Sequence, residues 1–260
     1  MVFPLAALSP AWFDIRSRLP EDTAVQVGLF VPCFVDLFYP EVAIATVRVL
    51  EHLGVHVDYP EDQTCCGQPQ FNTGRRDDAR ALALRFCRVF DRFDTIATPS
   101  GSCASMVRHH YGALVGDHPV RGRVFELSEF LARHLGATNL GAKLEGRAVL
   151  HVGCHAEHEL HVGSDTRTLL DHVQGLSIVQ VRSSAWCCGF GGTFSVKFPE
   201  ISTAMGRRKL EPMLDQDVDF LISTDSSCLM HLAGMLSREG RTRPRPVHVA
   251  EVLATCVEGA

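Results

Sequence analysis

Short apolar runs alternate with longer segments of helical period along most of the chain. Continuous apolar or β-prone stretches predict strands in the first part of the chain, at 25–32, 55–60 and 95–98. Between these stretches, apolar residues recur with a helical period over 40–54 and 75–93, and Gly54 is placed to end the first helix. Strands that alternate with helices predict an α/β fold with a parallel sheet.

The same succession occurs a second time, about half the chain length later. Four landmarks recur in the same order, with offsets of 121, 122, 125 and 122 residues: Cys33 with Cys154, Cys65-Cys66-Gly67 with Cys187-Cys188-Gly189, Cys103 with Cys228, and FELSEFLA (125–132) with VHVAEVLA (247–254). A constant order of landmarks indicates a duplicated supersecondary unit. We therefore expect two tandem, pseudo-symmetric Rossmann-like βαβ repeats at 24–140 and 146–256, after an N-terminal extension at 1–23.

Each repeat carries four cysteines on three predicted loops. The first set is Cys33, Cys65, Cys66 and Cys103, with the spacing C-x31-CC-x36-C; the second set is Cys154, Cys187, Cys188 and Cys228, with the spacing C-x32-CC-x39-C. Loops that follow the carboxyl ends of parallel strands gather at one edge of the sheet. We expect the four sulfurs of each set to converge there, in one pocket per repeat, as two polynuclear thiolate sites.

Zinc is the main alternative to an iron–sulfur cluster at these thiols. A tetrahedral zinc site, with Zn–S bonds of about 2.3 Å, needs sulfurs roughly 3.8 Å apart. Consecutive side chains tend to diverge, so neighbouring cysteines fit the wider corners of an iron–sulfur cluster better. A disulfide between neighbours would be strained, because Cα atoms about 3.8 Å apart lie below the usual disulfide range. Adjacent cysteines therefore fit an iron–sulfur cluster better than zinc, but the spacing itself supports only two polynuclear thiolate sites, and zinc at one site stays an alternative.

Glycines follow both cysteine pairs, at Gly67, Gly189, Gly191 and Gly192. Glycine lets the backbone turn its N–H groups toward an anionic object, and hydrogen bonds to sulfur help to set the potential of a cluster. These four glycines are candidate cofactor-binding positions. The alternative is that they only form tight turns.

Several other side chains lie near the cysteines in sequence. Four histidines lie close together in sequence, at His151, His155, His158 and His161, and could form a separate metal site. We expect them instead to be ordinary loop and helix positions, with only His155, beside Cys154, touching a cluster. His231, three residues after Cys228, is either an additional ligand or a helix residue packed behind the loop. Cys87 and Cys256 continue apolar stripes and are predicted to be core thiols.

Composition narrows the class of protein further. The 260 residues are 46% hydrophobic, enough for a real core, and the net charge of −5 gives no electrostatic case for nucleic acid or an anionic membrane. No apolar stretch is long enough for a transmembrane segment. Residues 1–20 lack the basic start of a signal peptide. Ten cysteines without an export signal indicate the cytoplasm, where clustered thiols are metal ligands or catalysts more often than disulfides.

Several stretches of the chain resemble the cysteine-rich CCG-domain family, which includes the B subunit of heterodisulfide reductase and the iron–sulfur subunit of glycolate oxidase. The resemblance covers about residues 24–256, is strongest to the lactate utilization branch, and is carried by PSGSCASM, CCGQPQFNTG, FELSEFL, CCGFGGTFSVK, SSCLMHL and HVAEVLA. It implies [4Fe–4S]-type clusters and electron transfer in a multi-subunit system that oxidises L-lactate, or a related 2-hydroxy acid, to pyruvate. The implied partners are a second iron–sulfur protein and a small third subunit.

The chain also departs from the family pattern. Heterodisulfide reductase relatives have a further cysteine three residues after the last one, where this chain has Met106 and His231. A five-cysteine cluster is therefore excluded. His158 stands where the branch is expected to have arginine.

The sequence places no catalytic residue and contains no nucleotide-binding motif. An oxidoreductase subunit that needs partners is the favoured interpretation. A zinc- or thiol-based structural or redox-sensing interaction protein, and a subunit of the glycolate oxidase or heterodisulfide reductase type, are the alternatives.

Overall fold

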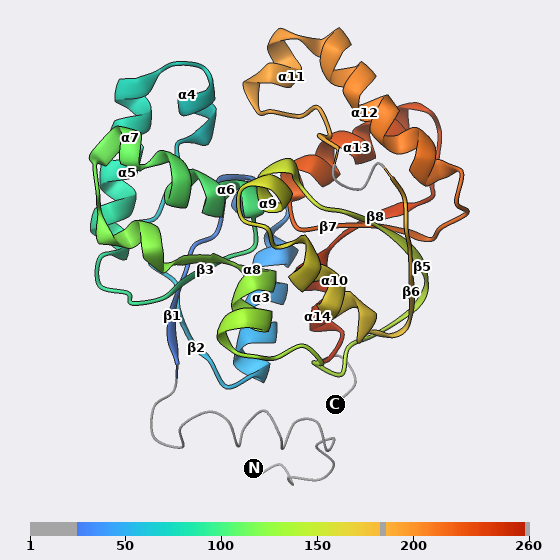
Figure 1. Cartoon of the computed structure of the whole chain (residues 1–260), viewed down its shortest axis with the longest axis horizontal. Helices are drawn as coiled ribbons and strands as arrows, with labels where there is room; N and C mark the ends of the chain where they lie inside the picture. Colours follow the sequence, from blue (N-terminus) through green and yellow to red (C-terminus); the bar gives the residue numbers. More distant parts are fainter. Residues whose placement is uncertain (1–24, 183–185, 258–260) are drawn as a thin grey trace, which may run out of the picture.

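Two four-stranded parallel sheets form the centre of the computed structural model, which describes residues 25–182 and 186–257 (Figure 1). The strands are β1 (Gln26–Leu29), β2 (His56–Asp58), β3 (Ile96–Thr98), β4 (Val124–Glu126), β5 (Lys143–His151), β6 (Gln174–Val179), β7 (Phe220–Ser223) and β8 (Arg245–His248). The strand orders, β2-β1-β3-β4 and β6-β5-β7-β8, repeat one topology. This confirms the predicted α/β class with two tandem Rossmann-like repeats.

Strand register ties the two repeats together residue by residue. Leu29 pairs with Ala97 in the first sheet, and Leu150 pairs with Ile222 in the second. These partners are separated by the same offsets, 121 and 125 residues, as the first and third cysteine landmarks. The extension predicted at 1–23 lies outside the described residues, and the division at 24–140 and 146–256 stays a prediction.

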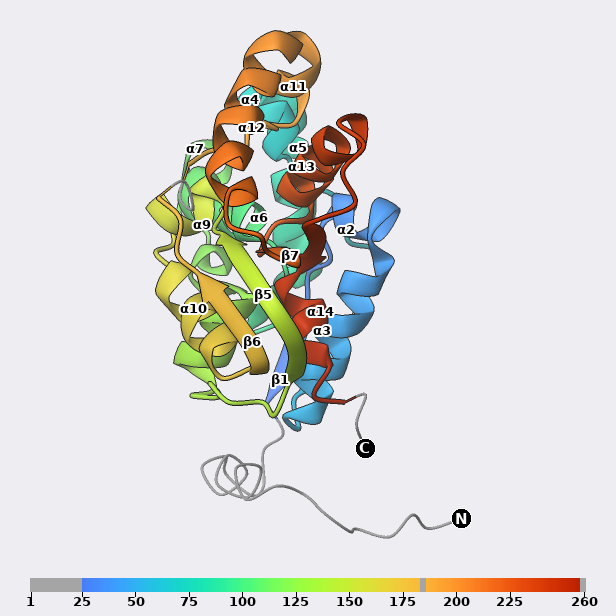
Figure 2. The same cartoon turned by 90° about the vertical axis from the view of Figure 1, so that its right-hand side faces the viewer.

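Helices cover both faces of the sheets; Figure 2 shows α10 and α14 on opposite faces of the second one. The described helices are α2 (Cys33–Phe38), α3 (Pro40–His52), α4 (Gln68–Asn72), α5 (Arg76–Phe90), α6 (Gly101–Ser105), η1 (Met106–His110), α7 (Gly112–Val115), η2 (Pro119–Arg123), α8 (Leu127–Glu129), η3 (Phe130–His134), α9 (Cys154–His158), α10 (Gly163–Asp171), α11 (Thr193–Lys197), α12 (Pro199–Leu214), α13 (Ser226–Arg238) and α14 (Val249–Ala254). As predicted, α3 ends beside a glycine: Gly54 has φ +77° and follows the last turn.

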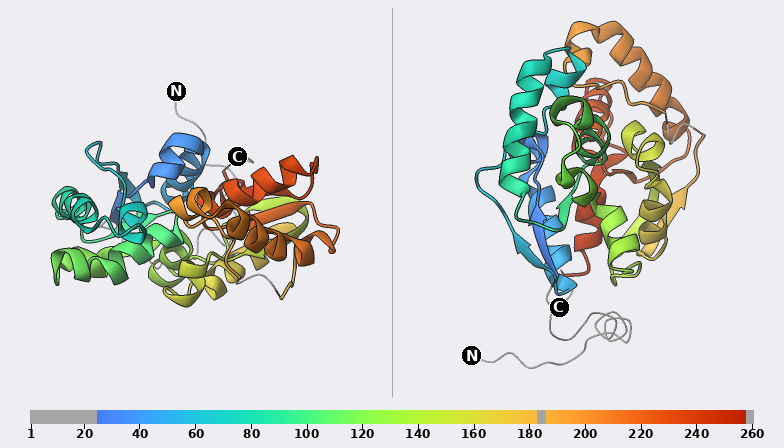
Figure 3. Two further views of the ribbon diagram at one scale, coloured as in Figure 1. Left: turned by 90° about the horizontal axis from the view of Figure 1, so that it is seen from above. Right: turned by 60° about the vertical axis from the view of Figure 1, so that its left-hand side comes forward.

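The two repeats meet through matched pairs of helices. Helix α3 lies against α14 and α8 lies against α10, and these two contacts correspond to each other under the repeat. In the same way, α2 contacts α13 and α6 contacts α9. Figure 3 shows the two repeats side by side. Because α2, α6, α9 and α13 each carry a cysteine of one set, this packing turns the carboxyl edges of the two sheets toward each other.

A buried core runs through both repeats. Apolar side chains of the first repeat, such as Val27 and Val49, and of the second, such as Val247 and Leu253, belong to one contiguous cluster. A smaller cluster beneath α12 and α13 includes Leu210 and Leu232. Since both sheets contribute to the main core, the position of one cysteine set is fixed relative to the other by ordinary hydrophobic packing.

Buried polar caps occupy equivalent places at the ends of β4 and β8. Glu126 accepts hydrogen bonds from the backbone N–H groups of Ser128 (2.7 Å) and Glu129 (3.2 Å), and His248 Nδ1 accepts from Ala250 N (3.1 Å). Burial raises the pKa of Glu126 to about 8 and lowers the pKa of His248 to about 4. Both caps are therefore neutral in the folded protein near neutral pH.

Replacing Glu126 with glutamine is expected to stabilise the fold above neutral pH. Between the ordinary pKa and a folded pKa of about 8, the unfolded carboxyl is ionised while the folded one keeps its proton, so stability falls as pH rises. Glutamine keeps the acceptor and removes this loss, which amounts to about 2 kcal/mol or more at about 1.4 kcal/mol per pKa unit. Urea unfolding at about pH 5.5 and about pH 8 measures the difference.

Glu129→Gln is the matched control for this prediction. Glu129 forms an ion pair with Arg108 at 2.6 Å, so its neutralisation should destabilise the fold at both pH values. A Glu126→Gln protein that loses stability at the higher pH would contradict the assignment of a protonated buried carboxyl.

Candidate metal centres

The first set of cysteines comes together at the carboxyl edge of the first sheet. Cys33 begins α2 after β1, Cys65 and Cys66 lie in the loop after β2, and Cys103 lies in α6 after β3. The Sγ atoms of Cys33 and Cys65 are 3.6 Å apart, and those of Cys66 and Cys103 are 3.5 Å apart. All four thiols line one cavity, so the structure brings the whole set together.

The second set repeats this arrangement. Cys188 Sγ lies 3.0 Å from Cys228 Sγ, and Cys154 and Cys187 line the same cavity. The loops that follow β5, β6 and β7 supply these residues, as the equivalent loops do in the first repeat. The structure therefore brings together the cysteines of each set that the spacing grouped, and their role as ligands stays a prediction.

Glycine shapes the turn that presents each cysteine pair. Gly67 has φ +84° and Gly189 has φ +89°, and their N–H groups donate to Cys65 Sγ and Cys187 Sγ at 3.4 Å each. Phe190 N also donates to Cys188 Sγ at 3.5 Å. The backbone thus points N–H groups at the sulfurs, which is the geometry that a cluster with negative charge uses.

Gly191 and Gly192 continue the second turn with φ of +54° and +62°. Both line the cavity between the two sets, described below. Neither shows a hydrogen bond from its own N–H group to a thiol among the described residues.

Gly189→Ala is expected to disrupt the second centre. A Cβ atom there would lie 2.5 Å from the carbonyl oxygen of Ser202, and the left-handed φ alone costs an L-residue about 1–2 kcal/mol. The turn must then move away from α12. We expect a lower melting temperature and loss of the metal of one centre, measured by differential scanning calorimetry and metal analysis.

Gly74→Ala provides the control. Gly74 has φ +79° but open space around its missing Cβ, so alanine there bears only the backbone strain. If Gly189→Ala binds as much metal and melts as high as Gly74→Ala, the turn does not depend on the close approach of Ser202.

One thiol of each set is ionised by its neighbours. Hydrogen bonds from Cys33 and then Cys66 lower the pKa of Cys65 to about 3, and hydrogen bonds from Cys154 and then Cys188 lower the pKa of Cys187 to about 2. The donors Cys33 and Cys154 have raised pKa values, because each shares its proton with that thiolate and because burial penalises a second charge. Full ligation by four thiolates therefore needs a cation, whose binding would release the remaining protons.

The two sets open into a shared cavity of about 190 Å³. All eight cysteines line it, together with Phe34, Phe190 and His155. We expected one pocket per repeat, and the structure instead joins the two sites, because α2 packs against α13 and α6 against α9 across the repeat junction. The rings of Phe34 and Phe190, from different repeats, contact each other with centroids 5.2 Å apart.

The chemistry of the lining fits a thiolate-bound cluster. Eight soft sulfur donors select zinc, Cu(I) or iron–sulfur clusters among metal groups. The backbone N–H groups aimed at sulfur suit a group with negative charge, and the cavity of about 190 Å³ beside the thiols leaves room for a group larger than a single ion. The donor set therefore fits a thiolate-bound metal group at each set. The sulfur separations of 3.6, 3.5 and 3.0 Å are close to those around a single tetrahedral ion, so the sulfurs would have to move apart to hold an iron–sulfur cluster.

The two predicted histidines lie in different places. His155 lines the shared cavity, with Nδ1 3.4 Å from Glu159 Oε2 and Nε2 3.4 Å from Gln68 Nε2. His231 lies behind the second cysteine turn, with Nε2 3.4 Å from Ser202 Oγ, and burial lowers its pKa. The structure thus places His155 beside the thiols and His231 one layer behind them.

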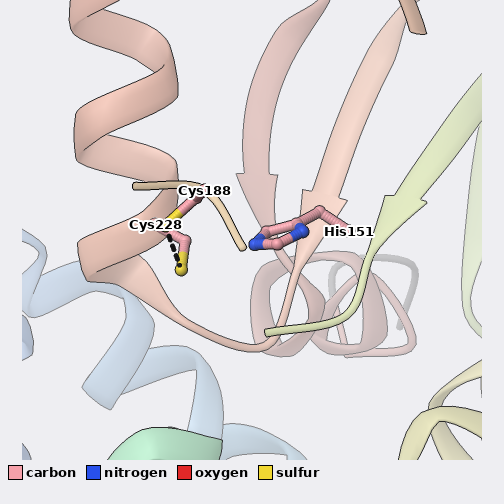
Figure 4. Close-up of side chains that lie close together, drawn as sticks. All are labelled: His151, Cys188 and Cys228. Atoms are coloured by element: carbon pink, nitrogen blue, oxygen red, sulfur yellow. Dashed lines mark hydrogen bonds between the residues drawn. The ribbon is translucent and has the colours of Figure 1, made fainter. Parts of the chain in front are cut away.

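Two functional positions were missed in the sequence. His151, expected to be an ordinary position, ends β5 with a ring nitrogen within 4.8 Å of the Sγ atoms of Cys188 and Cys228 (Figure 4). The sequence signal that could have identified this position is the change from Phe30 in the first repeat to a histidine in the second. His155 and Glu159 also form a second group of potential metal-binding side chains with His110.

Asp225 is the other position that sequence reasoning missed. Its Oδ1 accepts hydrogen bonds from Ser100 Oγ (2.8 Å), Ser102 Oγ (2.8 Å) and Ser102 N (3.1 Å), all in the first repeat. Burial raises the pKa of Asp225. Asp225 corresponds to Ser100 under the repeat, so this buried link joins equivalent loops, those that lead to Cys228 and Cys103.

Cys87 and Cys256 are core thiols, as predicted. Cys87 is buried in the main core and Cys256 packs against it, and burial raises the pKa of each to about 11. Neither lines the shared cavity. His158 is exposed beside Cys154 and Cys187, in an open pocket with Trp186 and Arg208.

Comparisons with known proteins agree with the repeat. A family model described as "Cysteine-rich domain", CCG, matches residues 27–108 and 148–233. "Lactate utilization protein A" of Geobacillus kaustophilus is 42% identical over 236 residues, which cover 88% of this chain and 98% of that protein. "Lactate utilization protein A 2" of Bacillus cereus strain Q1 is 40% identical over 238 residues, 88% of this chain and 98% of that protein.

Similarity to solved structures is weak. Glutamate racemase RacE1 of Bacillus anthracis aligns with a TM-score of 0.39 and 15% identity over 90% of this chain and 80% of that chain. Among the described residues, no helix has the length and apolar character needed to cross a bilayer.

Proposed function

The chain belongs to the cysteine-rich CCG-domain family that includes lactate utilization protein A, and from this premise we propose that it is the iron–sulfur electron-transfer subunit of a cytoplasmic system that oxidises L-lactate to pyruvate. The observation that carries the proposal is the convergence of two sets of four thiols on a shared cavity. Two zinc sites that served only to stabilise the fold would not need to open into one shared cavity.

Each set would hold one [4Fe–4S]-type cluster. Cys33, Cys65, Cys66 and Cys103 would bind the first, and Cys154, Cys187, Cys188 and Cys228 the second. When bound, such clusters accept and release single electrons at a potential set by their surroundings. Two of them match the two electrons that lactate oxidation releases.

The protein's own residues provide the environment of these centres. The N–H groups of Gly67 and Gly189 donate to the sulfurs, and the Phe34–Phe190 contact keeps the cavity wall apolar. Cys66 and Cys188 are buried, which limits the access of water and oxidants to those thiolates. These features support an electron carrier rather than a site for substrate chemistry.

Exposed apolar side chains support a role among partners. Leu37 and Phe38, 70% and 57% exposed, lie on the helix that begins at Cys33, and Val196 and Phe198, 80% and 51% exposed, follow the second cysteine turn. Exposed apolar groups of this size near a functional site are typical of protein contacts. We propose that the second iron–sulfur protein of the system docks here, with a small third subunit completing the assembly.

The proposal predicts that the isolated chain does not oxidise lactate. Removing protons and two electrons from a 2-hydroxy acid needs a positioned base, whereas the side chains gathered at this site are suited to thiolate ligation. We expect negligible lactate-dependent reduction of an artificial acceptor by the purified, cluster-loaded chain, and turnover once both partners are added. Robust turnover by the chain alone would refute the assignment as an electron-transfer subunit.

A further inference from the structure

The two cysteine sets lie on matching backbones but have different surroundings. Buried positions of α5 and α12 correspond one to one at an offset of 123 residues: Ala79, Ala83, Phe86, Cys87 and Phe90 match Ser202, Gly206, Lys209, Leu210 and Met213. The glycine contacts agree, because Ala79 O approaches Gly67 just as Ser202 O approaches Gly189. Lys209 therefore stands where the first repeat has Phe86.

A second pair of equivalent positions also has an aromatic hydrocarbon side chain in the first repeat and a nitrogen-containing one in the second. Strand register makes Leu150 the counterpart of Leu29, so His151 follows where Phe30 does. In the first repeat the rings of Phe30 and Phe86 contact each other, with centroids 4.9 Å apart. The second repeat replaces this aromatic pair by His151 and Lys209, and both side chains are fully buried.

A third position completes the contrast. Three residues after the last cysteine of each set, the first repeat has Met106, which is fully buried, and the second has His231. The first set is therefore backed by Phe30, Phe86 and Met106, which carry no charge and no nitrogen. The second set is backed by side chains that carry nitrogen at all three places.

The nitrogen groups lie close to the second set. A ring nitrogen of His151 is within 4.8 Å of Cys188 Sγ and Cys228 Sγ, and Figure 4 shows the ring beside these two side chains. Burial lowers the pKa of Lys209 to about 8, and the thiolate charges of the second set act in the opposite direction. The mutual attraction places the Lys209 side chain near the sulfurs of the second set, at the buried position that Phe86 occupies in the first repeat.

We propose that the second set holds a centre with a higher reduction potential than the first. The inference rests on the proposed function. A buried cation favours the reduced, more negative form of a nearby cluster, and the attraction is strong where little water screens it. Asp225 acts in the opposite sense on Cys154, so the predicted order requires that the Lys209 cation outweighs this carboxyl.

Two site-isolated proteins test the order of the potentials. Changing Cys65 and Cys66 to serine leaves only the second centre, and changing Cys187 and Cys188 leaves only the first. Midpoint potentials come from dithionite titrations followed by electron paramagnetic resonance. We expect the protein with only the second centre to be reduced at the higher potential. An equal or reversed order would overturn the inference while the proposed function stands, and failure of both proteins to bind iron and sulfide would overturn both.

Lys209→Met tests the cause of the difference. We expect a lower potential of the second centre, by at least a tenfold change in the reduction equilibrium, which is about 59 mV for one electron, and no change in the first. Lys143→Met makes the same chemical change at an exposed position where β5 begins, far from the thiols, and should shift neither potential. An unchanged potential of the second centre in Lys209→Met would contradict the role of this cation. His151→Phe, which introduces the residue found in the first repeat, applies the same test at the neighbouring position.

Discussion

We expect that changing Cys66 or Cys188 to serine abolishes lactate-dependent electron transfer in the proposed assembly. Each of these thiols is buried and links a neighbour of its own loop to the last cysteine of its set, Cys103 or Cys228. Serine cannot supply the soft thiolate that an iron–sulfur cluster requires. We expect loss of most of the visible absorption of one cluster and of all turnover, because both centres are needed for electrons to pass.

The same variants are expected to keep the α/β fold. Cysteine and serine differ little in volume, and the main core around Val27 and Leu253 does not depend on these thiols. Far-ultraviolet circular dichroism should stay close to that of the unchanged protein. Cys256→Ser is the control, because this thiol lies outside the shared cavity; it should retain turnover. Full activity of both Cys66→Ser and Cys188→Ser would contradict the role of the clusters.

Asp225→Ala is expected to cause the largest loss of stability among the single changes considered. The carboxylate accepts three hydrogen bonds from Ser100 and Ser102 across the junction of the repeats. Alanine would remove this acceptor from the buried Ser100 hydroxyl and from the half-buried Ser102, whose hydroxyl also lies 3.1 Å from that of Ser100, at a cost of about 1–3 kcal/mol for each group left unsatisfied. We expect a loss of about 3 kcal/mol or more, with weaker retention of metal by both sets, since the link joins the loops that carry Cys103 and Cys228.

Asp225→Asn separates the hydrogen bonds from the charge. The amide keeps an oxygen that accepts from the same donors, so the loss in the free energy of unfolding should be clearly smaller than for alanine. Urea unfolding of both variants, with metal content measured alongside, checks the comparison. An alanine variant as stable as the unchanged protein would show that the link contributes nothing to holding the repeats together.

The fold could be predicted from the sequence because buried strands and duplicated landmarks leave strong local signals. The run before Cys33 and the run before Cys154 are apolar on both faces, and the offsets between landmarks agree within four residues. The grouping of four thiols per repeat followed, because loops after parallel strands meet at one edge. These inferences needed only local pattern and a general rule of sheet geometry.

The shared cavity could not be predicted in this way, because it depends on how the two repeats pack. No local pattern shows that α2 meets α13 or that Asp225 reaches Ser100. The contrast between Phe86 and Lys209 was hidden for another reason. The cysteine pairs of the two repeats are offset by 122 residues, whereas the helices that follow them, α5 and α12, are offset by 123. An alignment on the cysteines alone therefore matches Lys209 with Cys87, and only the buried positions of the two helices show that its counterpart is Phe86.

Iron and acid-labile sulfide, counted per chain after anaerobic reconstitution, test the central claim most directly. The unchanged protein should bind both elements in amounts that correspond to two clusters. The protein with serine at Cys65 and Cys66, and the one with serine at Cys187 and Cys188, should each bind the amount of one cluster. Stoichiometric zinc without sulfide in the unchanged protein would contradict the account.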